Sequence, residues 1–380
     1  MVERTTPALS AGNPLRRYSR HLLIPEIGLS GQQKLARARV LVVGAGGLGS
    51  PVLQYLAAAG VGRLGIVDDD TVDLSNLQRQ VIYAQADIGR SKAAAAAERV
   101  AALNPQVGID PFPIRFDPGN ARELVRLYDV VIDATDTFGA RYLINDACRL
   151  EGKPDVYGSI FRFDGQVSVF APQGPCYRCL FPEPPPSGSV PSCAEGGVLG
   201  VLAGLVGTWQ ANEALKLVLG IGEPLAGRLL LVDALAARLR EVTFGCDPEC
   251  PLHGSQPTIS DVAMHPAAVA TPFPRETQEI DAAALDDYLE AHPVTRVLDV
   301  REVHERALGP APQSIAIPAS ALAARLHELD SAREYVVACR IGAKSAWAAE
   351  LLADAGFRRL RHLHGGLLAY AVARPNFEFF

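Results

Sequence analysis

The sequence predicts an α/β protein built from two units, a larger one followed by a smaller one. Apolar, β-branched runs alternate with helical stretches over most of the 380 residues, which is the pattern of a sheet covered by helices on both faces. The segment from Gly254 to Glu276 is instead rich in proline and has no sustained period, which is typical of a linker. We therefore expect a first domain over 14–254, a linker over 255–276 and a second domain over 277–380.

Short buried strands are expected in the larger unit. Arg39–Val43 and Leu64–Val67 are compact apolar runs, and Val130–Ala134 is a third. The alanine-rich stretch Ser91–Leu103 has strong helix propensity and stops at an Asn-Pro pair. Strands and helices therefore alternate along this unit, as expected for a sheet covered by helices on both faces.

The smaller unit repeats this alternation with unrelated residues. Ala282–Glu290 and Ser345–Ala355 have helical patterns, and Gly356 closes the second of them. Arg296–Val300 and Tyr335–Ala338 are apolar runs that we expect to be strands. The two units therefore share a class of fold but not a repeated sequence.

Composition excludes several classes of protein. Hydrophobic residues make up 48% of the chain and charged residues 21%, which is typical of a folded protein. The net charge of −6 argues against a nucleic-acid-binding protein. The longest uncharged apolar stretch, 196–212, is short and rich in glycine, so we expect a buried helix and no membrane contact.

The cysteines and the N-terminus indicate the compartment. Seven cysteines are an odd number for a secreted disulfide framework, and the pair Cys176-x-x-Cys179 points to metal chemistry in a reducing environment. The first residues lack the basic start and apolar core of a signal peptide. We expect a cytoplasmic protein.

A glycine-rich loop follows the first strand. Gly44, Gly46, Gly47 and Gly49 permit a tight turn, and they let backbone N–H groups approach phosphates at the start of a helix. The next strand ends at Asp68, whose carboxylate is placed to hold ribose hydroxyls. This arrangement favours nucleotide binding over the alternative interpretation, a glycine turn that serves only close packing. It does not show whether the nucleotide is NAD or ATP.

Charged residues after the loop favour ATP. Arg79 and Lys92 are cations placed for triphosphate charge, and a lysine in the first turn of a helix opposes the helix dipole unless an anion lies there. Asp136 follows a buried strand and is placed to hold Mg²⁺, which prefers one or two carboxylates plus phosphates. Each charge alone is more often a surface residue, but a nicotinamide site needs none of the three.

Several motifs resemble the MoeB/ThiF family, relatives of ubiquitin-activating enzymes. They are GAGGLGS at 44–50, D-x-D-T-V-D-L-S-N-L-Q-R-Q at 68–80, the helix-opening lysine and A-T-D at 134–136. The resemblance covers roughly 15–255 and implies a Rossmann-like nucleotide-binding domain with a mixed sheet. Enzymes of that family adenylate the C-terminal glycine of a small ubiquitin-like sulfur carrier protein. The attacking carboxylate is already ionised at neutral pH, so positioning and positive charge suffice and no general base is required.

The resemblance assigns roles by position. Asn76 and Arg79 would contact phosphates with Lys92 beside them, and Arg20 matches an arginine that reaches the ATP of a partner subunit, which implies a homodimer. Thr137 departs from the asparagine that relatives commonly carry. The expected nucleotide contacts are Gly44, Gly46, Gly47, Gly49, Asp68, Asp70, Ser75, Asn76, Leu77, Gln78, Arg79, Lys92, Asp136 and Thr137.

Two cysteine groups distant in sequence predict a structural Zn²⁺ site. Cys176 and Cys179 have the spacing of a zinc half-site, while the second half is irregular, C-D-P-E-C-P-L-H over 246–253. We favour Cys176, Cys179, Cys250 and His253 as ligands, with Cys246 as the alternative fourth ligand. The other interpretation is a degenerate site that holds no metal.

Two further cysteines of the larger unit have different expected roles. Cys193 follows a proline-rich run, and the family resemblance places it on a mobile crossover loop near the nucleotide, where some relatives form a covalent link to the carrier. Cys148 lies in a helical stretch and is expected to be a buried, small apolar residue.

The smaller unit carries a candidate nucleophile. A strand ends at Cys339, and a helix starts in the loop that follows, so backbone N–H groups together with Arg340 and Lys344 would stabilise a thiolate. A cysteine phosphatase would need arginine where this chain has Ser345. The thiolate is suited to carry persulfide sulfur.

The smaller unit also resembles a rhodanese domain over 277–380. The matching motifs are L-D-V-R-E at 298–302, C-R-x-G-x-x-S at 339–345 and Gly365-Gly366, while Pro310–Ser314 departs from the family pattern. The resemblance implies a sulfurtransferase, and an inactive rhodanese-like module is the alternative.

Together the motifs predict an ATP-dependent adenylyltransferase fused to its own sulfurtransferase. The partners would be a carrier ending in Gly-Gly and a persulfide donor, a cysteine desulfurase or thiosulfate, and molybdopterin biosynthesis is one of several pathways that use such carriers. The carrier would become an acyl adenylate and then a thiocarboxylate. Alternatives are an adenylyltransferase with an accessory rhodanese module, an enzyme of ubiquitin-like conjugation, a NAD-dependent dehydrogenase, a non-catalytic scaffold, and a sulfurtransferase with a vestigial nucleotide domain.

Overall fold

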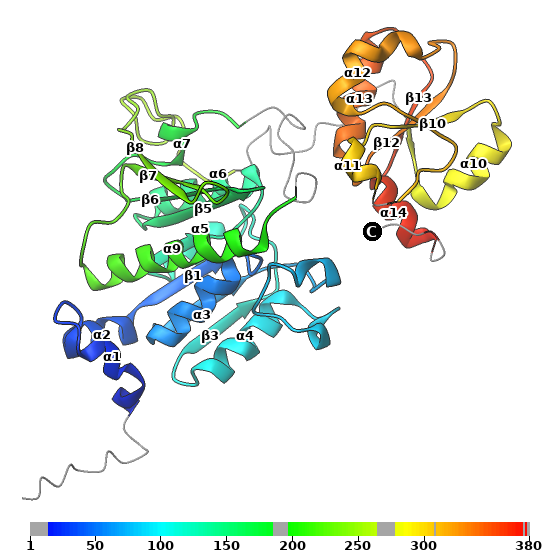
Figure 1. The fold of residues 1–380 in the computed structure, drawn as a ribbon. Helices are drawn as coiled ribbons and strands as arrows, with labels where there is room; N and C mark the ends of the chain where they lie inside the picture. Colours follow the sequence, from blue (N-terminus) through cyan, green and yellow to red (C-terminus); the bar gives the residue numbers. More distant parts are fainter. Residues whose placement is uncertain (1–13, 185–196, 264–277, 308, 375–376, 378–380) are drawn as a thin grey trace, which may run out of the picture. The chain divides into compact units, whose positions relative to one another are not determined.

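The computed structural model describes residues 14–184, 197–263, 278–307, 309–374 and 377. The described chain forms two compact units (Figure 1): the first takes 14–184 and 198–263, and the second begins at 278. Each unit has its own sheet and its own hydrophobic core. We describe the two units separately.

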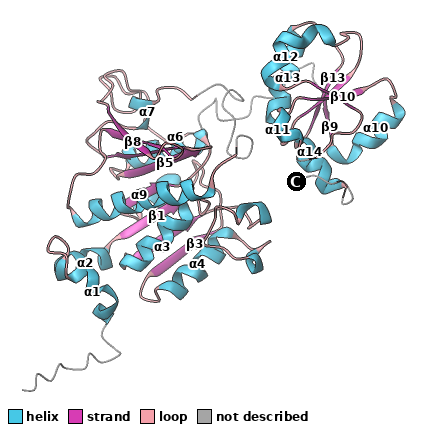
Figure 2. Ribbon diagram, viewed as in Figure 1, coloured by secondary structure: helices cyan, strands magenta, loops and turns pink. Residues whose placement is uncertain are grey.

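The first unit is an eight-stranded mixed sheet. Its order is β3 (Gly108–Phe112), β2 (Arg63–Val67), β1 (Arg39–Val43), β4 (Val130–Asp133), β5 (Asp155–Phe161), β6 (Asp164–Phe170), β7 (Arg228–Asp233) and β8 (Arg238–Thr243). The strands from β3 to β5 run parallel, whereas β6, β7 and β8 pair antiparallel. Figure 2 shows helices on both faces, and the expected α/β architecture with a mixed sheet is confirmed.

Two helical layers enclose this sheet. One core contains residues of α2 (Gly28–Arg37), α3 (Gly49–Ala59), α4 (Lys92–Leu103) and α9 (Gly200–Leu219), and the other contains residues of α5 (Ala121–Arg126) and α6 (Phe138–Leu150). Shorter helices are η1 (Pro14–Tyr18), α1 (Ser19–Leu22), η2 (Leu74–Asn76), η3 (Gln85–Asp87) and α7 (Tyr177–Leu180). The apolar stretch expected to be a buried helix forms most of α9, which packs on α3 and on β4 to β6. No helix in the described ranges has the length and apolar character needed to cross a membrane.

The second unit is a five-stranded parallel sheet. Its order is β11 (Ser314–Ala316), β10 (Arg296–Asp299), β12 (Tyr335–Ala338), β13 (Leu360–Leu363) and β9 (Gln278–Ile280). Its helices are η5 (Ala282–Ala284), α10 (Leu285–Ala291), α11 (Val303–Arg306), α12 (Ala319–Leu322), η6 (Ala323–Glu328), α13 (Ala343–Asp354) and α14 (Gly366–Ala373).

Local sequence explains where the key elements begin and end. Four of the five residues of β1 are buried, as its apolar run predicts. The helix expected from Ser91 starts one residue later, because Ser91 is the N-cap and its hydroxyl accepts the Ala94 N–H at 3.4 Å. The helix expected from Ser345 starts two residues earlier, at Ala343. Both differences lie at helix starts. Lys92 lies in the first turn of α4, and Lys344 and Ser345 lie in the first turn of α13.

Candidate functional site

The glycine loop lies between β1 and α3. Gly44 has φ +96°, and a Cβ there would lie 2.6 Å from the Ala134 carbonyl oxygen at the end of β4. A Cβ on Gly49 would overlap the Gly44 carbonyl oxygen. Glycine is therefore required for a turn that brings the start of α3 against the ends of β1 and β4.

Asp68 follows β2 and braces this loop. One carboxylate oxygen accepts the Ala45 N–H at 2.8 Å, and the other accepts the Asp70 N–H at 3.0 Å. Burial raises the pKa of Asp68, although these hydrogen bonds and the Lys92 charge oppose that rise. Each carboxylate oxygen keeps acceptor capacity, so the geometry suits a ribose hydroxyl at this edge of the sheet.

Lys92 is the first residue of α4 and is only 6% exposed. Its Nζ lies 2.8 Å from a carboxylate oxygen of Asp70, whose side chain is 70% exposed. The anion that the sequence requires beside this lysine is therefore Asp70 in this structure. A bound triphosphate would compete with Asp70 for the same ammonium group.

Arg79 crosses the glycine loop. A Cβ on Gly47 would lie 3.5 Å from Arg79 Cγ, and the guanidinium donates to the Ser75 carbonyl at 3.1 Å. The turn that carries Arg79 is held by Asp73, whose carboxylate accepts from the Ser75 N–H and hydroxyl, and Asn76 accepts the Asp73 N–H at 3.3 Å. The structure thus brings Arg79 to the loop, with Asn76 beside it.

The remaining candidate residues of this site differ in exposure. Asp136 and Thr137 are exposed after β4, and the Thr137 hydroxyl caps α6 by accepting the Ala140 N–H at 3.4 Å. Leu77 packs against the core, and Gln78 is exposed. One exposed carboxylate beside a phosphate-binding loop fits Mg²⁺, which takes its other ligands from water and phosphate.

Arg20 is not brought to the loop by any contact in the described chain. Arg20 is exposed in α1. Cys193 lies within 185–196, outside the described residues.

Tyr83 is a residue of this site that the sequence analysis missed. Its buried hydroxyl lies 2.8 Å from the Ala45 carbonyl oxygen and 3.2 Å from the Lys92 carbonyl oxygen, so it joins the glycine loop to α4. Burial raises the pKa of this hydroxyl. A lone tyrosine between two motifs carries no pattern that could have identified it.

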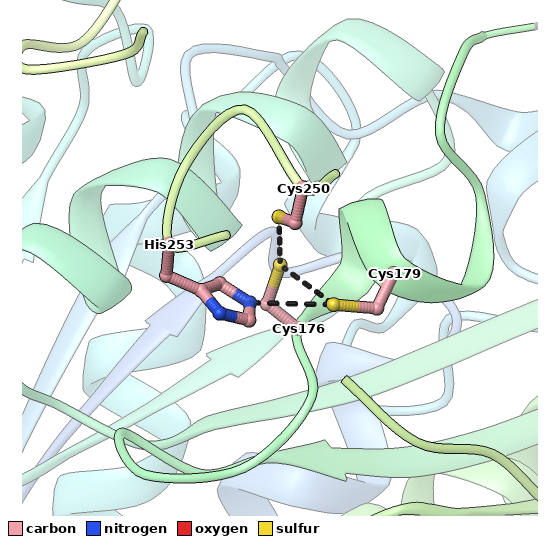
Figure 3. A group of neighbouring side chains, drawn as sticks. All are labelled: Cys176, Cys179, Cys250 and His253. Carbon is pink, nitrogen blue, oxygen red and sulfur yellow. Dashed lines mark hydrogen bonds between the residues drawn. The ribbon is translucent and has the colours of Figure 1, made fainter. Parts of the chain in front are cut away.

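Cys176, Cys179, Cys250 and His253 form one cluster (Figure 3), in which the candidate ligand atoms all lie within 4.8 Å of one another. Cys176 Sγ lies 3.7 Å from Cys250 Sγ and 3.9 Å from Cys179 Sγ, and Cys179 Sγ lies 3.3 Å from His253 Nε2. Cys246, the alternative fourth ligand, is exposed and lies outside the group.

The donor set fits a tetrahedral metal. With Zn–S bonds of about 2.3 Å, sulfur atoms at the corners of a tetrahedron lie about 3.8 Å apart, close to both observed separations. Burial raises the pKa of Cys176, with the neighbouring thiols adding to the rise, and burial also raises the pKa of Cys179. Burial lowers the pKa of His253, which favours the neutral ring. Three thiols and a neutral imidazole are suited to Zn²⁺.

Cys148 packs among apolar residues of the second core, and burial raises the pKa of its thiol well above the ordinary value. The expected role as a small buried apolar residue is confirmed.

Cys339 begins the loop between β12 and α13 in the second unit. The Gly342 N–H donates to Cys339 Sγ at 3.1 Å, and the Ser345 hydroxyl lies 3.4 Å from the same sulfur. Gly342 is the N-cap of α13 and has φ +102°, in the left-handed region that favours glycine. Cys339 is 1% exposed, so the sulfur lies inside a cradle made by its own loop.

The charges beside this loop are partly paired. Lys344 Nζ lies 2.9 Å from a carboxylate oxygen of Glu305, a buried residue of α11. Asp299 and Arg301 form a buried pair at 2.7 Å after β10. Gly366 fits closely, because a Cβ there would lie 2.6 Å from the carbonyl oxygens of Cys339 and Arg340.

Comparison with known proteins identifies both units. The ThiF family matches residues 18–252, and the rhodanese-like domain matches residues 281–373. A "Sulfur carrier protein adenylyltransferase" of Thermus thermophilus is 55% identical over 67% of this chain and 96% of its own length. A "Probable adenylyltransferase/sulfurtransferase MoeZ" of Mycobacterium tuberculosis is 46% identical over 93% of this chain and 92% of its own.

Relatives extend to plants. The "Adenylyltransferase and sulfurtransferase MOCS3-1" of Zea mays is 42% identical over 93% of this chain and 81% of its own. The crystal structure of MccB of E. coli matches the fold with a TM-score of 0.53 and 19% identity, over 59% of this chain and 67% of that one. Residue matches over both units, at this identity and coverage, mean that the chain belongs to the ThiF family of enzymes and, within it, to the adenylyltransferase/sulfurtransferases that carry a C-terminal rhodanese-like domain.

Proposed function

We propose that this enzyme adenylates the C-terminal glycine of a ubiquitin-like sulfur carrier protein and then converts it to a thiocarboxylate with sulfur held on Cys339. The observation that carries the proposal is that one chain holds a cation-lined phosphate loop and a cradled cysteine, in two units that each match the corresponding family.

Adenylation requires charge neutralisation and positioning. The carrier carboxylate attacks the α-phosphorus of ATP, which forms the acyl adenylate and releases pyrophosphate. The glycine loop and the start of α3 would hold the phosphates, while Arg79 and Lys92 would stabilise the charge that gathers on the leaving group. Asp68 would hold the ribose and Asp136 would hold Mg²⁺, which supplies positive charge to the phosphates when bound.

Sulfur transfer follows in the second unit. A donor, a cysteine desulfurase persulfide or thiosulfate, gives Cys339 a terminal sulfur, and the resulting persulfide anion attacks the acyl adenylate carbonyl and releases AMP. A second thiolate, assigned to Cys193, then attacks the Cys339 sulfur and frees the thiocarboxylate. The disulfide left between the two cysteines is reduced by a cellular dithiol. Because Cys339 itself is buried, we expect the terminal persulfide sulfur to be the atom that the carrier reaches.

Three features complete the proposal. Cys176, Cys179, Cys250 and His253 would hold a structural Zn²⁺. Arg20, exposed in α1, would serve the nucleotide of a partner subunit in a homodimer. Free thiols persist in a reducing compartment, which supports a cytoplasmic location.

Pyrophosphate exchange tests the first half. Exchange of labelled pyrophosphate into ATP should require a carrier that ends in Gly-Gly and should vanish when one residue is added after the terminal glycine. Exchange without a carrier, or with the extended carrier, would contradict the proposal.

Cysteine variants test the second half. Cys339→Ala should abolish sulfur transfer from thiosulfate and thiocarboxylate formation while exchange persists, because the two reactions use different units. Cys246→Ala is the matched control, since this cysteine is exposed and outside the metal cluster. Sulfur transfer retained in Cys339→Ala would reject the assignment.

A further inference from the structure

His362 is buried beneath the cysteine loop of the second unit and belongs to none of the motifs above. It lies in β13 and is 2% exposed. Its Nε2 lies 2.8 Å from the Gly342 carbonyl oxygen. Since a carbonyl oxygen only accepts hydrogen bonds, this ring nitrogen carries the proton.

The Gly342 carbonyl oxygen has three potential donors. The Ala346 N–H donates to it at 3.1 Å as the first hydrogen bond of α13, His362 Nε2 lies at 2.8 Å, and the Ser345 hydroxyl lies at 2.9 Å. A carbonyl oxygen has two lone pairs, which the Ala346 and His362 protons fill. The third donor is therefore in excess at this acceptor.

The Ser345 hydroxyl has a second acceptor within reach. It is fully buried and lies 3.4 Å from Cys339 Sγ, and it has a single proton to give. A hydrogen bond to an anionic sulfur is stronger than one to a neutral carbonyl that is already saturated. With His362 in place, we expect the Ser345 proton to go to the sulfur rather than to the Gly342 carbonyl oxygen.

We propose that His362 is a positioning residue for sulfur transfer: by occupying the Gly342 carbonyl oxygen it leaves the Ser345 hydroxyl proton for the Cys339 sulfur. The inference rests on the proposed role of Cys339. It predicts that the sulfur of Cys339 has two donors, the Gly342 N–H and the Ser345 hydroxyl, only while His362 donates.

The charged surroundings of His362 are compatible with this role. Burial lowers the pKa of the ring, His364 lowers it further, and the Gly342 hydrogen bond and the Glu279 carboxylate oppose the change. The neutral ring that burial favours still donates from Nε2. Arg340 and the Lys344–Glu305 pair lie on the loop side and are unchanged in every variant below.

The test measures the ionisation of Cys339 in the full-length protein. The rate of Cys339 alkylation by iodoacetamide is followed against pH, with the modified peptide quantified by mass spectrometry. His362→Leu removes the donor and should move the alkylation midpoint up by about one pH unit, because the thiolate loses a hydrogen bond. At a pH below the wild-type midpoint this should lower kcat for thiosulfate sulfur transfer about tenfold with little change in KM.

Two further variants separate positioning from simple loss of structure. His362→Gln keeps an N–H at the Nε2 position and should restore the wild-type midpoint. Ser345→Ala should give the same shift as His362→Leu, and the double variant should shift no further, since the histidine acts only through the serine.

Several outcomes would overturn the inference. They are an unchanged midpoint in His362→Leu, a shift in His362→Gln as large as that in His362→Leu, or additive shifts in the double variant. Sulfur transfer by Cys339→Ala would instead reject the proposed function. The alkylation profiles of the wild type and of the His362 and Ser345 variants could still be measured and interpreted in that case. The two failures are therefore distinguishable.

Discussion

The glycine loop of the first unit and the cysteine loop of the second occupy the same place in their sheets. Each follows a central parallel strand and leads into a helix, at the edge where parallel strands end. The glycine loop supplies backbone and takes its cations from distant segments: Arg79 lies across it, and Lys92 comes from the start of another helix. The cysteine loop surrounds its sulfur with its own N–H and hydroxyl groups.

Under the proposed function, the difference follows from the size of the anion that each loop would hold. A triphosphate carries several charges and leaves after each cycle, so its site must offer cations that have another partner in the meantime, as Lys92 has in Asp70. A persulfide carries one charge and is covalently attached, so the loop that bears the cysteine is sufficient. Two solutions to anion binding thus share one strand–loop–helix plan.

The two units also differ in what holds them together. Among the described residues, the cysteine and histidine cluster lies in the first unit alone. It ties α7 to the segment that contains Cys250 and His253. Both units have an apolar core and a buried ion pair, Asp146 with Arg178 in the first and Asp299 with Arg301 in the second, so the cluster is the feature that distinguishes the first unit.

If the cluster holds Zn²⁺ as proposed, loss of the metal should destabilise the first unit and leave the stability of the second unchanged. Cys250→Ser should abolish binding of one zinc ion per chain and lower the melting temperature of the first unit by roughly 10 °C. A ligand present at a thousand times its Kd contributes about 4 kcal/mol, and each kcal/mol shifts a domain of this size by about 2–4 °C. Metal analysis and calorimetry measure both effects, and the transition of the second unit should stay in place.

Cys246→Ser is the matched control, because Cys246 is exposed and outside the cluster. It should keep the zinc and the melting temperature. Zinc lost from Cys246→Ser but retained in His253→Ala would reverse the choice of fourth ligand.

The cations next to the glycine loop should affect pyrophosphate exchange and leave sulfur transfer unchanged. Lys92→Ala should lower pyrophosphate exchange by roughly 10²–10³-fold, the usual cost of losing one preorganised charge donor, and should leave thiosulfate sulfur transfer unchanged. Arg90→Ala is a suitable control, since Arg90 is two residues away but pairs at the surface with Asp87 and Glu98. Equal losses in the two variants would mean that charge in this region, rather than the position of Lys92, supports adenylation.

Sequence patterns predicted the fold because it depends on local rules. Apolar runs such as Arg39–Val43 became buried strands, and the glycine spacing predicted the turn that Gly44 adopts at φ +96°. The loop at Cys339 could be predicted in the same way, because its strand and helix are consecutive in the chain.

Contacts between distant segments could not be predicted. From the sequence, Lys92 and Asp70 are expected as separate nucleotide contacts, and only the fold shows that they pair with each other. The sequence favoured His253 over Cys246 as the fourth ligand but left both open, and the fold brings His253 to the three cysteines of the cluster. His362 shows the same limit, since a histidine in an apolar strand has no pattern that points to a loop twenty residues earlier.

Buried carboxylates differ in whether a cation pairs with them. Asp299 and Glu305 in the second unit and Asp146 in the first each pair with a cation, although Glu305 Oε1 has no hydrogen-bond partner among the described residues. In the first, Asp155 Oδ1 and Asp133 Oδ2 are buried without a hydrogen-bond partner among the described residues. Burial raises the pKa of Asp155 well above its ordinary value, and the neighbouring Asp133 raises it further.

This makes the stability of the first unit pH-dependent. Well below pH 4 the folded and unfolded states both hold the Asp155 proton, but as pH rises the unfolded state releases it first, so stability falls from the ordinary pKa up to the raised one. Asp155→Asn removes this loss, about 1.4 kcal/mol for each unit by which the folded pKa exceeds the unfolded one. Its melting temperature should match the wild type well below pH 4 and exceed it increasingly as pH rises from the ordinary pKa toward the raised one. Asp146→Asn is the control, because it breaks the buried pair with Arg178 and should destabilise the unit at pH 8. A higher melting temperature in both variants would show that the presence of a paired cation does not decide the effect of removing a buried carboxylate.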